Sequence, residues 1–260
     1  MTPTSRALAV LAFTVFATAC GGGGSNAPTK EAAAPLTNPV DPATAGAVTG
    51  HVTFSGQAPA PTPISMASDP RCPNTGATAQ PVMVGANGSL QNAFVYVKDG
   101  LGNLKFPVPT TPVVLDQSGC QYSPHVFGVQ VGQTVEILNS DPTLHNIHAI
   151  PGTNQEFNTA QPMQNMKTEH VFTAKEDKVV IPFKCDVHGW MNAYAGVLDH
   201  PYFAVTGEDG KFSIKNLPPG TYKLTAWHEK AGTKTIDVTV AAKETKEDAN
   251  FSFAAPAGAN

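Results

Sequence analysis

The chain has 260 residues, of which 41% are hydrophobic and only 14% charged, with 23 Gly and 23 Pro. Charged residues supply about a quarter of an average globular domain, so the residues that favour long helices are scarce here. Abundant Gly, Pro, Val and Thr favour an all-β protein with many turns. The formal net charge of −4 and the lack of a basic stripe argue against nucleic acid as a partner. No stretch is long enough to span a bilayer.

Residues 1–19 have the features of a signal peptide. Arg6 precedes an apolar run, Ala7 to Phe16, that is too short for a membrane helix. The small residues before Cys20 resemble the lipobox of bacterial lipoproteins, although Ala17 stands where that motif usually has Leu. We expect Cys20 to carry a lipid and residues 20–47 to form a flexible linker in the periplasm or at the cell surface, where disulfides are permitted. Ordinary cleavage by signal peptidase is the alternative.

From Val48 onward, short β-type runs alternate with Gly, Pro, Asn and Asp turn signals, which is typical of β-sandwiches and barrels. No strong 3.6-residue periodicity occurs, so any helix should be short. The runs expected to form strands are 48–54, 93–97, 126–131, 134–138, 179–183, 211–214, 221–227 and 235–240.

The last third of the chain carries Gly-Glu-Asp-Gly-Lys-Phe at 207–212 and Leu-Pro-Pro-Gly-Thr-Tyr at 217–222. This pattern resembles the carboxypeptidase regulatory-like (transthyretin-like) β-sandwich family. The usual opening strands of that family are missing directly upstream, but suitable runs occur far away, before residue 110. The resemblance implies an Ig/transthyretin-like sandwich split into residues 48–109 and 206–255, with a second domain, 110–205, inserted between them. Two domains in tandem are the alternative.

Four side chains of the middle segment have the residue types of a blue-copper site: His145, and then Cys185, His188 and Met191. A soft thiolate favours copper, two imidazoles supply nitrogen ligands, and a thioether can serve as a weak axial ligand. A Cys at the end of one strand and a Met at the start of the next would place three ligands at one end of a sandwich. Zinc is the competing metal, although Met is an unusual zinc ligand. The loop lacks the second cysteine that a binuclear copper centre needs.

The Cys-x2-His-x2-Met spacing, together with Asn139 and the pair His145-Asn146 upstream, resembles the cupredoxins, the plastocyanin and amicyanin family, over about residues 110–205. The resemblance implies a Greek-key sandwich that binds one mononuclear type 1 copper through His145, Cys185, His188 and Met191. It also implies that Asn146 hydrogen-bonds to the cysteine loop and fixes the ligands. Gly189 is a departure, since the amicyanin loop has a proline there.

Pro142, Leu144 and Trp190 flank the ligands and are expected to form an apolar rim around the edge of His188. In cupredoxins such a patch is where redox partners dock, which implies a small transient interface with a cytochrome c-type protein or a membrane electron-transfer complex. As the ligand expected nearest to solvent, His188 should make the site sensitive to acid.

Cys72 and Cys120 are the remaining cysteines, and in an exported chain we expect them to form a disulfide; two free buried thiols are the alternative. His148 follows His145 by three residues and should point to the opposite face of its strand. His200 and His228 could meet at the domain interface as a structural pair. Whether His125, His148, His200 or His228 form a second metal site is left open.

The sequence therefore predicts an exported, lipid-anchored electron carrier and not an enzyme, because no hydrolase or nucleotide-binding motif occurs. Two other hypotheses stay open. One is a copper-binding or copper-storage module, and the other is an adhesion or scaffold lipoprotein in which copper is structural.

Overall fold

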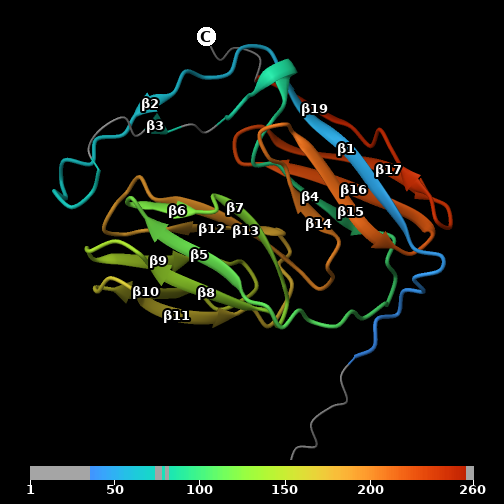
Figure 1. Ribbon diagram of the computed structural model, residues 1–260, viewed down its shortest axis with the longest axis horizontal. Coiled ribbons are helices and arrows are strands. Elements are labelled where there is room, and N and C mark those ends of the chain that lie inside the picture. Colours follow the sequence, from blue (N-terminus) through green and yellow to red (C-terminus); the bar gives the residue numbers. More distant parts are fainter. Residues whose placement is uncertain (1–35, 74–77, 80–81, 256–260) are drawn as a thin grey trace, which may run out of the picture. The chain divides into compact units, whose positions relative to one another are not determined.

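A computed structural model of the protein describes residues 36–73, 78–79 and 82–255 (Figure 1). The described residues form β-strands and one short 3-10 helix, η1 (Ala86–Gly88), so the all-β prediction is confirmed. Every run expected to form a strand coincides with one to within a few residues. Among these residues, no helix combines the length and the apolar character needed to cross a membrane.

Nine consecutive strands form what we call the central sandwich. Its two sheets have the strand orders β11-β8-β5-β6 and β10-β9-β12-β13-β7, and their inward side chains share one core. The strands are β5 (Val113–Ser118), β6 (Gln121–Ser123), β7 (Val126–Gln130), β8 (Thr134–Asn139), β9 (His145–Ala149), β10 (Phe157–Gln161), β11 (Met166–Val171), β12 (Val180–Lys184) and β13 (Asn192–Leu198).

Alternating side chains explain why these runs become sandwich strands. In β8, Val135, Ile137 and Asn139 are buried, while the residues between them are half-buried. In β12, Ile181 and Phe183 point into the core. This two-residue period gives each sheet one apolar face, which is stable only when it is covered by the other sheet.

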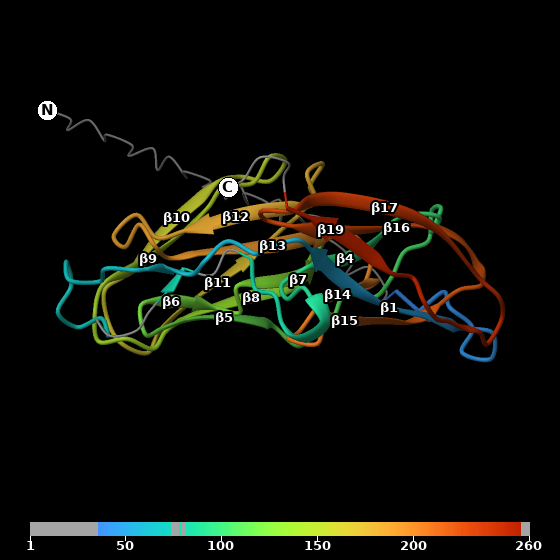
Figure 2. The same cartoon turned by 90° about the horizontal axis from the view of Figure 1, so that it is seen from above.

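The strands before and after the central sandwich pair with one another and form what we call the flanking sandwich. One sheet has the order β15-β1-β18, with β19 also paired to β1, and the other has the order β14-β4-β16-β17. These strands are β1 (Gly46–Ser55), β4 (Phe94–Asp99), β14 (Phe203–Val205), β15 (Lys211–Leu217), β16 (Gly220–His228), β17 (Gly232–Val240), β18 (Thr245–Lys246) and β19 (Phe251–Ala254). Figure 1 shows the two groups of strands as two layered bodies, and Figure 2 shows the same strands from above.

The strand pairing does not follow the predicted domain boundary at residues 205/206. Residues up to Val205 were expected in the central domain, but β14 pairs antiparallel with β4, with Phe203 opposite Tyr96. The chain has therefore returned to the flanking sandwich before Phe203. A three-residue apolar run has no local feature that specifies which sheet it joins, so only the tertiary pairing decides it.

The segment after β1 crosses to the central sandwich, although residues 48–109 were all expected in the flanking one. It contains β2 (Thr62–Pro63) and β3 (Thr78–Ala79), which pair only with each other in the described part of the chain. Met66 and Cys72 are buried in the central core, together with Cys185. In both cartoon views the segment runs past the end of the central sandwich that carries β6.

Candidate metal centre

The predicted ligands come from three adjoining strands. His145 is the first residue of β9, Cys185 directly follows β12, and Met191 directly precedes β13. β12 pairs with both neighbours, since Lys184 lies opposite His148 of β9 and opposite Asn192 of β13. This register brings the start of β9 and the whole Cys185–Met191 loop to the same end of one sheet.

Three of the ligand side chains converge there, and all three are buried. The Nδ1 atoms of His145 and His188 are 2.9 Å apart, and the Sγ of Cys185 is 3.8 Å from the Nδ1 of His188. One nitrogen of each imidazole and the sulfur all lie within 4.8 Å of one another. Metal–nitrogen and metal–thiolate bonds are about 2.0 and 2.3 Å long, so one ion can bridge donors at the measured separations. The donor set therefore fits a single metal ion.

Met191 completes the loop. Its backbone N–H donates to the His188 carbonyl at 2.9 Å, and its own carbonyl accepts from the Cys185 N–H at 3.2 Å. Its side chain is 1% exposed and belongs to the same core cluster as Cys185. The loop is thus closed by two backbone hydrogen bonds, which hold the Met191 backbone next to those of Cys185 and His188.

Cys185 and His145 shift each other's pKa in opposite directions. Burial opposes the thiolate of Cys185, but hydrogen bonds from His145 and from backbone amides, including that of His188, lower its pKa overall. Burial also opposes protonation of His145, but its bonds to Cys185 and Asp141 raise the pKa of this imidazole overall.

Each imidazole also contacts a carboxylate through its other nitrogen. The Nε2 of His145 is 2.9 Å from the Oδ2 of Asp141, which also accepts the Cys120 N–H at 2.8 Å. The Nε2 of His188 is 3.3 Å from the Oδ2 of Asp69. Sequence reasoning missed both carboxylates. Asp141 lies only four residues before His145, so its position in the sequence could have identified it. Asp69 lies on a distant segment and has no metal-ligand spacing to the other residues.

His188 is not distinguished as the ligand nearest to solvent, because all four predicted ligands are at most 3% exposed. Its ring is 2% exposed. Burial, and then the charge of His145, lower the pKa of His188 despite the opposing carboxylates. The acid sensitivity expected through this residue stays a prediction.

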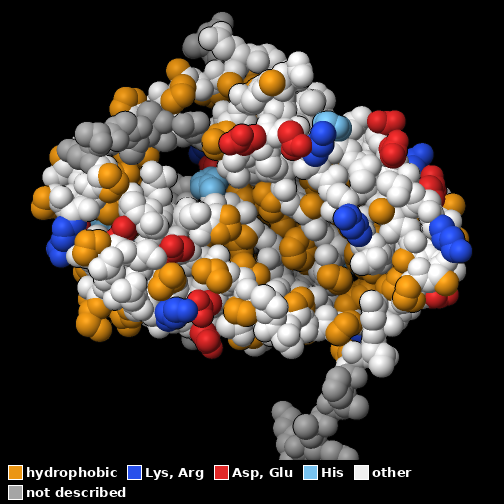
Figure 3. Space-filling model, viewed as in Figure 1, with side chains coloured by type: hydrophobic (Ala, Val, Ile, Leu, Met, Phe, Trp, Pro, Cys, Tyr) orange, Lys and Arg blue, Asp and Glu red, His pale blue; other side chains and the backbone are white. Residues whose placement is uncertain are grey.

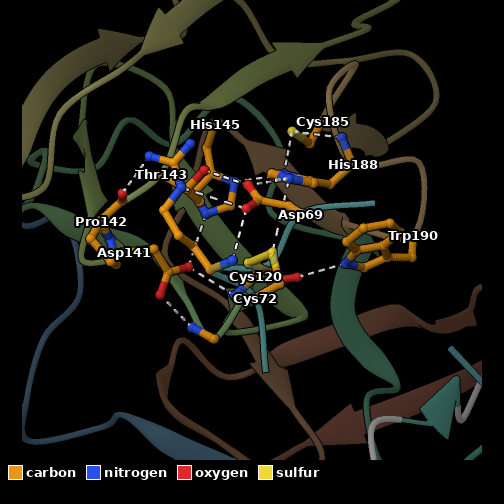
Figure 4. Close-up of a disulfide and its surroundings, with 12 residues drawn as sticks. Asp69, Cys72, Cys120, Asp141, Pro142, Thr143, His145, Cys185, His188 and Trp190 are labelled. Atoms are coloured by element: carbon orange, nitrogen blue, oxygen red, sulfur yellow. Dashed lines mark hydrogen bonds and ion pairs between the residues drawn. A yellow bond between two sulfur atoms is a disulfide. The ribbon is translucent and has the colours of Figure 1, made fainter. Parts of the chain in front are cut away.

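The residues expected to form an apolar rim around His188 differ in their exposure and contacts. Trp190 packs 5.0 Å from the His188 ring, and its indole N–H donates to the Cys120 carbonyl at 3.0 Å. Pro142 and Leu144 are exposed, and the Pro142 carbonyl accepts from Arg71 at 3.1 Å. Figure 4 shows Asp69 and the disulfide beside His188. A segment far away in the chain therefore lies against one side of this ring, and the docking patch stays a prediction.

Cys72 and Cys120 form the predicted disulfide, with their Cα atoms 5.6 Å apart, and Cys185 is a free buried thiol. The disulfide joins the segment after β1 to the β5–β6 turn of the central sandwich. The Sγ of Cys72 is 3.9 Å from the Nε2 of His188, so the bridge lies directly against a predicted ligand.

Asn146 has the bonding expected of it. Its Oδ1 accepts the backbone N–H of Asp186, the residue after Cys185. Its own carbonyl accepts the hydroxyl of Tyr122, from the other sheet. Asn146 thereby ties the cysteine loop to β9 and to the opposite sheet.

The other histidines lie outside the centre. Among the described residues, none of the groups of three donors close enough to hold a metal includes His125, His148, His200 or His228. His148 points away from His145, as expected, and contacts Glu156 and Asp186 at 2.7 and 2.8 Å. The idea that His200 and His228 pair is wrong: His200 donates to the Val97 carbonyl, and His228 accepts backbone amides of its own turn.

The expected signal peptide, the lipidated Cys20 and the first part of the linker lie outside the described residues.

The space-filling view in Figure 3 shows acidic and basic side chains mixed over the face that it presents.

The fold and the site define an all-β protein with a buried thiolate–imidazole centre at one end of one of its two sandwiches. The profile of the carboxypeptidase regulatory-like domain matches residues 196–254, which contain β14 to β19. This match confirms the resemblance seen in the 207–222 motif. No curated protein matches the sequence.

Solved structures similar to parts of the chain include a nitrite reductase, a cupredoxin and an amicyanin variant. A copper-containing nitrite reductase from Thermus scotoductus SA-01 has 19% identity and a TM-score of 0.32, covering 40% of this chain and 26% of that one. A purple cupredoxin from Nitrosopumilus maritimus has 25% identity and a TM-score of 0.28, covering 33% and 98%. A reduced amicyanin variant has 25% identity and a TM-score of 0.29, covering 35% and 85%. The chain thus spans about a quarter of the nitrite reductase.

Proposed function

We propose that this protein binds one mononuclear type 1 copper and carries electrons between redox partners. The observation that carries the proposal is the convergence of the Cys185 sulfur with the Nδ1 atoms of His145 and His188 in a buried pocket. Bound copper would supply the one-electron couple. A thiolate with two imidazoles also suits zinc, but the buried Met191, whose backbone is hydrogen-bonded to those of Cys185 and His188, favours copper, for which Met is a usual weak ligand.

The chain's own residues keep the centre rigid and dry. Asp141 and Asp69 fix the two imidazoles, Asn146 fixes the cysteine loop, and the backbone N–H of His188 points at the Cys185 sulfur at 3.4 Å. His145 and Cys185 are 0% and 3% exposed, so bulk water is excluded. A donor set that is already assembled moves little when its charge changes, which suits electron relay better than bond-making chemistry.

We also propose the setting of this carrier. Cleavage before Cys20 and lipidation of that residue would anchor the chain at a membrane in the periplasm or at the cell surface. The partners would be a cytochrome c-type protein or a membrane electron-transfer complex. The central sandwich would be an insertion into a regulatory-like sandwich, which the pairing of β4 with β14 and β16 supports. Replacing Cys20 with Ala should release the protein from membranes.

The test of the copper proposal is the visible absorption of the purified, copper-loaded full chain. We expect an intense blue or purple colour from the Cys185–copper bond, and its loss in Cys185→Ser. Gly189→Ala is a matched control in the same loop, because a Cβ at Gly189 meets no atom within 4 Å. Protein that binds one equivalent of copper without colour, or that binds only zinc, would overturn the proposal.

The burial of His188 favours one alternative, a copper-storage module, because an enclosed ring offers no direct contact to a partner. The electron self-exchange rate separates the two functions. A carrier exchanges electrons rapidly between its oxidised and reduced forms, whereas a storage module exchanges them slowly and holds Cu(I) very tightly.

A further inference from the structure

Residues Met66–Cys72, which we call the cap, cover the metal centre although they belong to neither sheet of the central sandwich. Met66 is 0% exposed in the central core, and Cys72 is bonded to Cys120. Two backbone bonds of 3.1 Å fold the cap between these anchors: Asp69 N–H to the Met66 carbonyl, and Cys72 N–H to the Asp69 carbonyl. The cap is therefore held at both ends, with Asp69 at its turn.

The turn aims the Asp69 carboxylate into the centre. Its Oδ1 accepts the Arg71 N–H at 2.9 Å, and its Oδ2 accepts the Thr143 hydroxyl and lies 3.3 Å from the Nε2 of His188. Thr143 is itself 1% exposed and lies two residues before His145. The carboxylate is thus fixed by donors from the cap and from the central sandwich (Figure 4).

A carboxylate accepts hydrogen bonds, so its contact with His188 requires the proton on Nε2. The Nδ1 of the same ring then keeps its lone pair, and this atom faces His145 and Cys185. Asp141 makes the equivalent contact with His145. The same Asp141 also accepts the N–H groups of Gly119 and Cys120, at 2.8 Å each. Because Cys120 is bonded to Cys72, the disulfide links the cap that carries Asp69 to the turn that binds Asp141.

We propose that Asp69 is a positioning residue of the metal centre. Delivered by the disulfide-tied cap, it holds His188 in the Nε2–H tautomer with Nδ1 directed at the metal position, and the cap closes this side of the centre to solvent. The proposal rests on the proposed metal site, and it adds a residue from outside the predicted metal-binding domain. Loss of a carboxylate that orients a metal-ligating histidine commonly weakens metal binding about 10- to 100-fold.

The first test compares Asp69→Asn with the unaltered full chain. We expect the affinity for Cu(II), measured by competition with a chelator, to fall about 10- to 100-fold. In the metal-free protein, the ¹⁵N shifts of His188 should show loss of the single Nε2–H tautomer. Asp69→Glu should restore both in part. Asp237→Asn, an exposed aspartate on β17, is the control for loss of one negative charge.

The second test measures how fast iodoacetamide alkylates Cys185 in the metal-free protein, with the labelled site found by peptide mapping. Removing the disulfide in a Cys72→Ser/Cys120→Ser variant should speed the alkylation of Cys185 at least tenfold. Circular dichroism checks that the variant remains folded. If that variant is unfolded, Met66→Ala loosens the other anchor and serves the same purpose.

The outcomes separate this inference from the proposed function. Wild-type affinity and an unchanged His188 tautomer in a folded Asp69→Asn protein would overturn the role of Asp69, even if the protein is blue. An unchanged alkylation rate in a folded Cys72→Ser/Cys120→Ser variant would overturn the claim that the cap shields the centre from solvent. If the wild type binds no copper, the proposed function fails, while the tautomer and alkylation measurements still decide the two structural claims.

Discussion

Gly196 and Phe94 are in such close contact that a Cβ built on the glycine would overlap the phenyl ring. Gly196 lies on β13 of the central sandwich, opposite Gly128 of β7, and Phe94 belongs to β4 of the flanking sandwich. Phe203 of β14 occupies the equivalent place over Gly128. The paired glycines thus form a flat slot into which two stacked rings, 5.6 Å apart, are packed.

Gly196→Ala should therefore destabilise the protein by about 1–3 kcal/mol, the usual cost of overpacking a filled core. Phe94 is 0% exposed and has no free space into which to move. Chemical unfolding of the metal-free protein measures the loss. Gly189→Ala adds the same methyl group in open space and should change the free energy of unfolding by less than about 0.5 kcal/mol. Equal stability of the two variants would contradict the close packing.

The Cys72–Cys120 disulfide should contribute about 4 kcal/mol to the free energy of unfolding, by the loop-entropy relation for its sequence separation of 48 residues. The variant Cys72→Ser/Cys120→Ser tests this in the absence of metal, by denaturant unfolding without reductant. A loss below about 1 kcal/mol would mean that the reduced chain already keeps these segments together.

The buried carboxylate of Glu176 should give the protein an acid-sensitive loop. Its Oε2 accepts the N–H groups of Gly152 and Thr153, and its Oε1 accepts that of Asn154, each at 2.8 Å. Burial opposes its charge, but bonds from the Asn154 side chain and these amides lower the pKa below the ordinary 4.5. A carboxyl whose pKa is lower in the folded state stabilises the fold above about pH 4.5, and this contribution is lost as the pH falls through the folded value.

Glu176→Gln should cost about 1.5–3 kcal/mol at neutral pH, because hydrogen bonds to a charged acceptor are replaced by weaker ones. It should also flatten the fall in stability between neutral and acid pH. Thermal unfolding over a pH series measures both effects. The exposed neighbour Asp177 supplies the control, Asp177→Asn, which should keep the wild-type profile. A wild-type acid profile in Glu176→Gln would contradict the assignment.

Met191→Leu tests the axial role of the thioether. Leu has a similar volume, so the metal-free protein should lose less than about 1.5 kcal/mol of stability. The copper-loaded variant should keep an intense colour, because Cys185 still supplies the thiolate, and its reduction potential should rise, because a weak donor to Cu(II) is gone. Cyclic voltammetry measures the potential. A potential equal to that of the wild type would exclude Met191 as a ligand.

Local patterns were enough for the strands and for the ligand end of the central sandwich. The turn residues and the two-residue burial period mark most strands, and Cys185 and Met191 are close in the chain because a short loop joins β12 to β13. His145, 40 residues before Cys185, was found from its residue type and from the resemblance of Asn139 and the pair His145-Asn146 to the cupredoxins. These features depend on interactions over a few residues, which a sequence displays directly.

The surroundings of His188 were decided only by the tertiary structure. Asp69 is 119 residues from His188 in the chain, and nothing in its local sequence marks it as part of the site. Likewise, the return of Phe203–Val205 to the flanking sandwich depends on a slot made by two glycines of other strands. The amino-acid sequence by itself indicated which side chains could hold a metal ion. Whether His188 faces water or a carboxylate depends on long-range packing, because a distant segment can cover a surface without leaving a periodic or spaced signal in the chain.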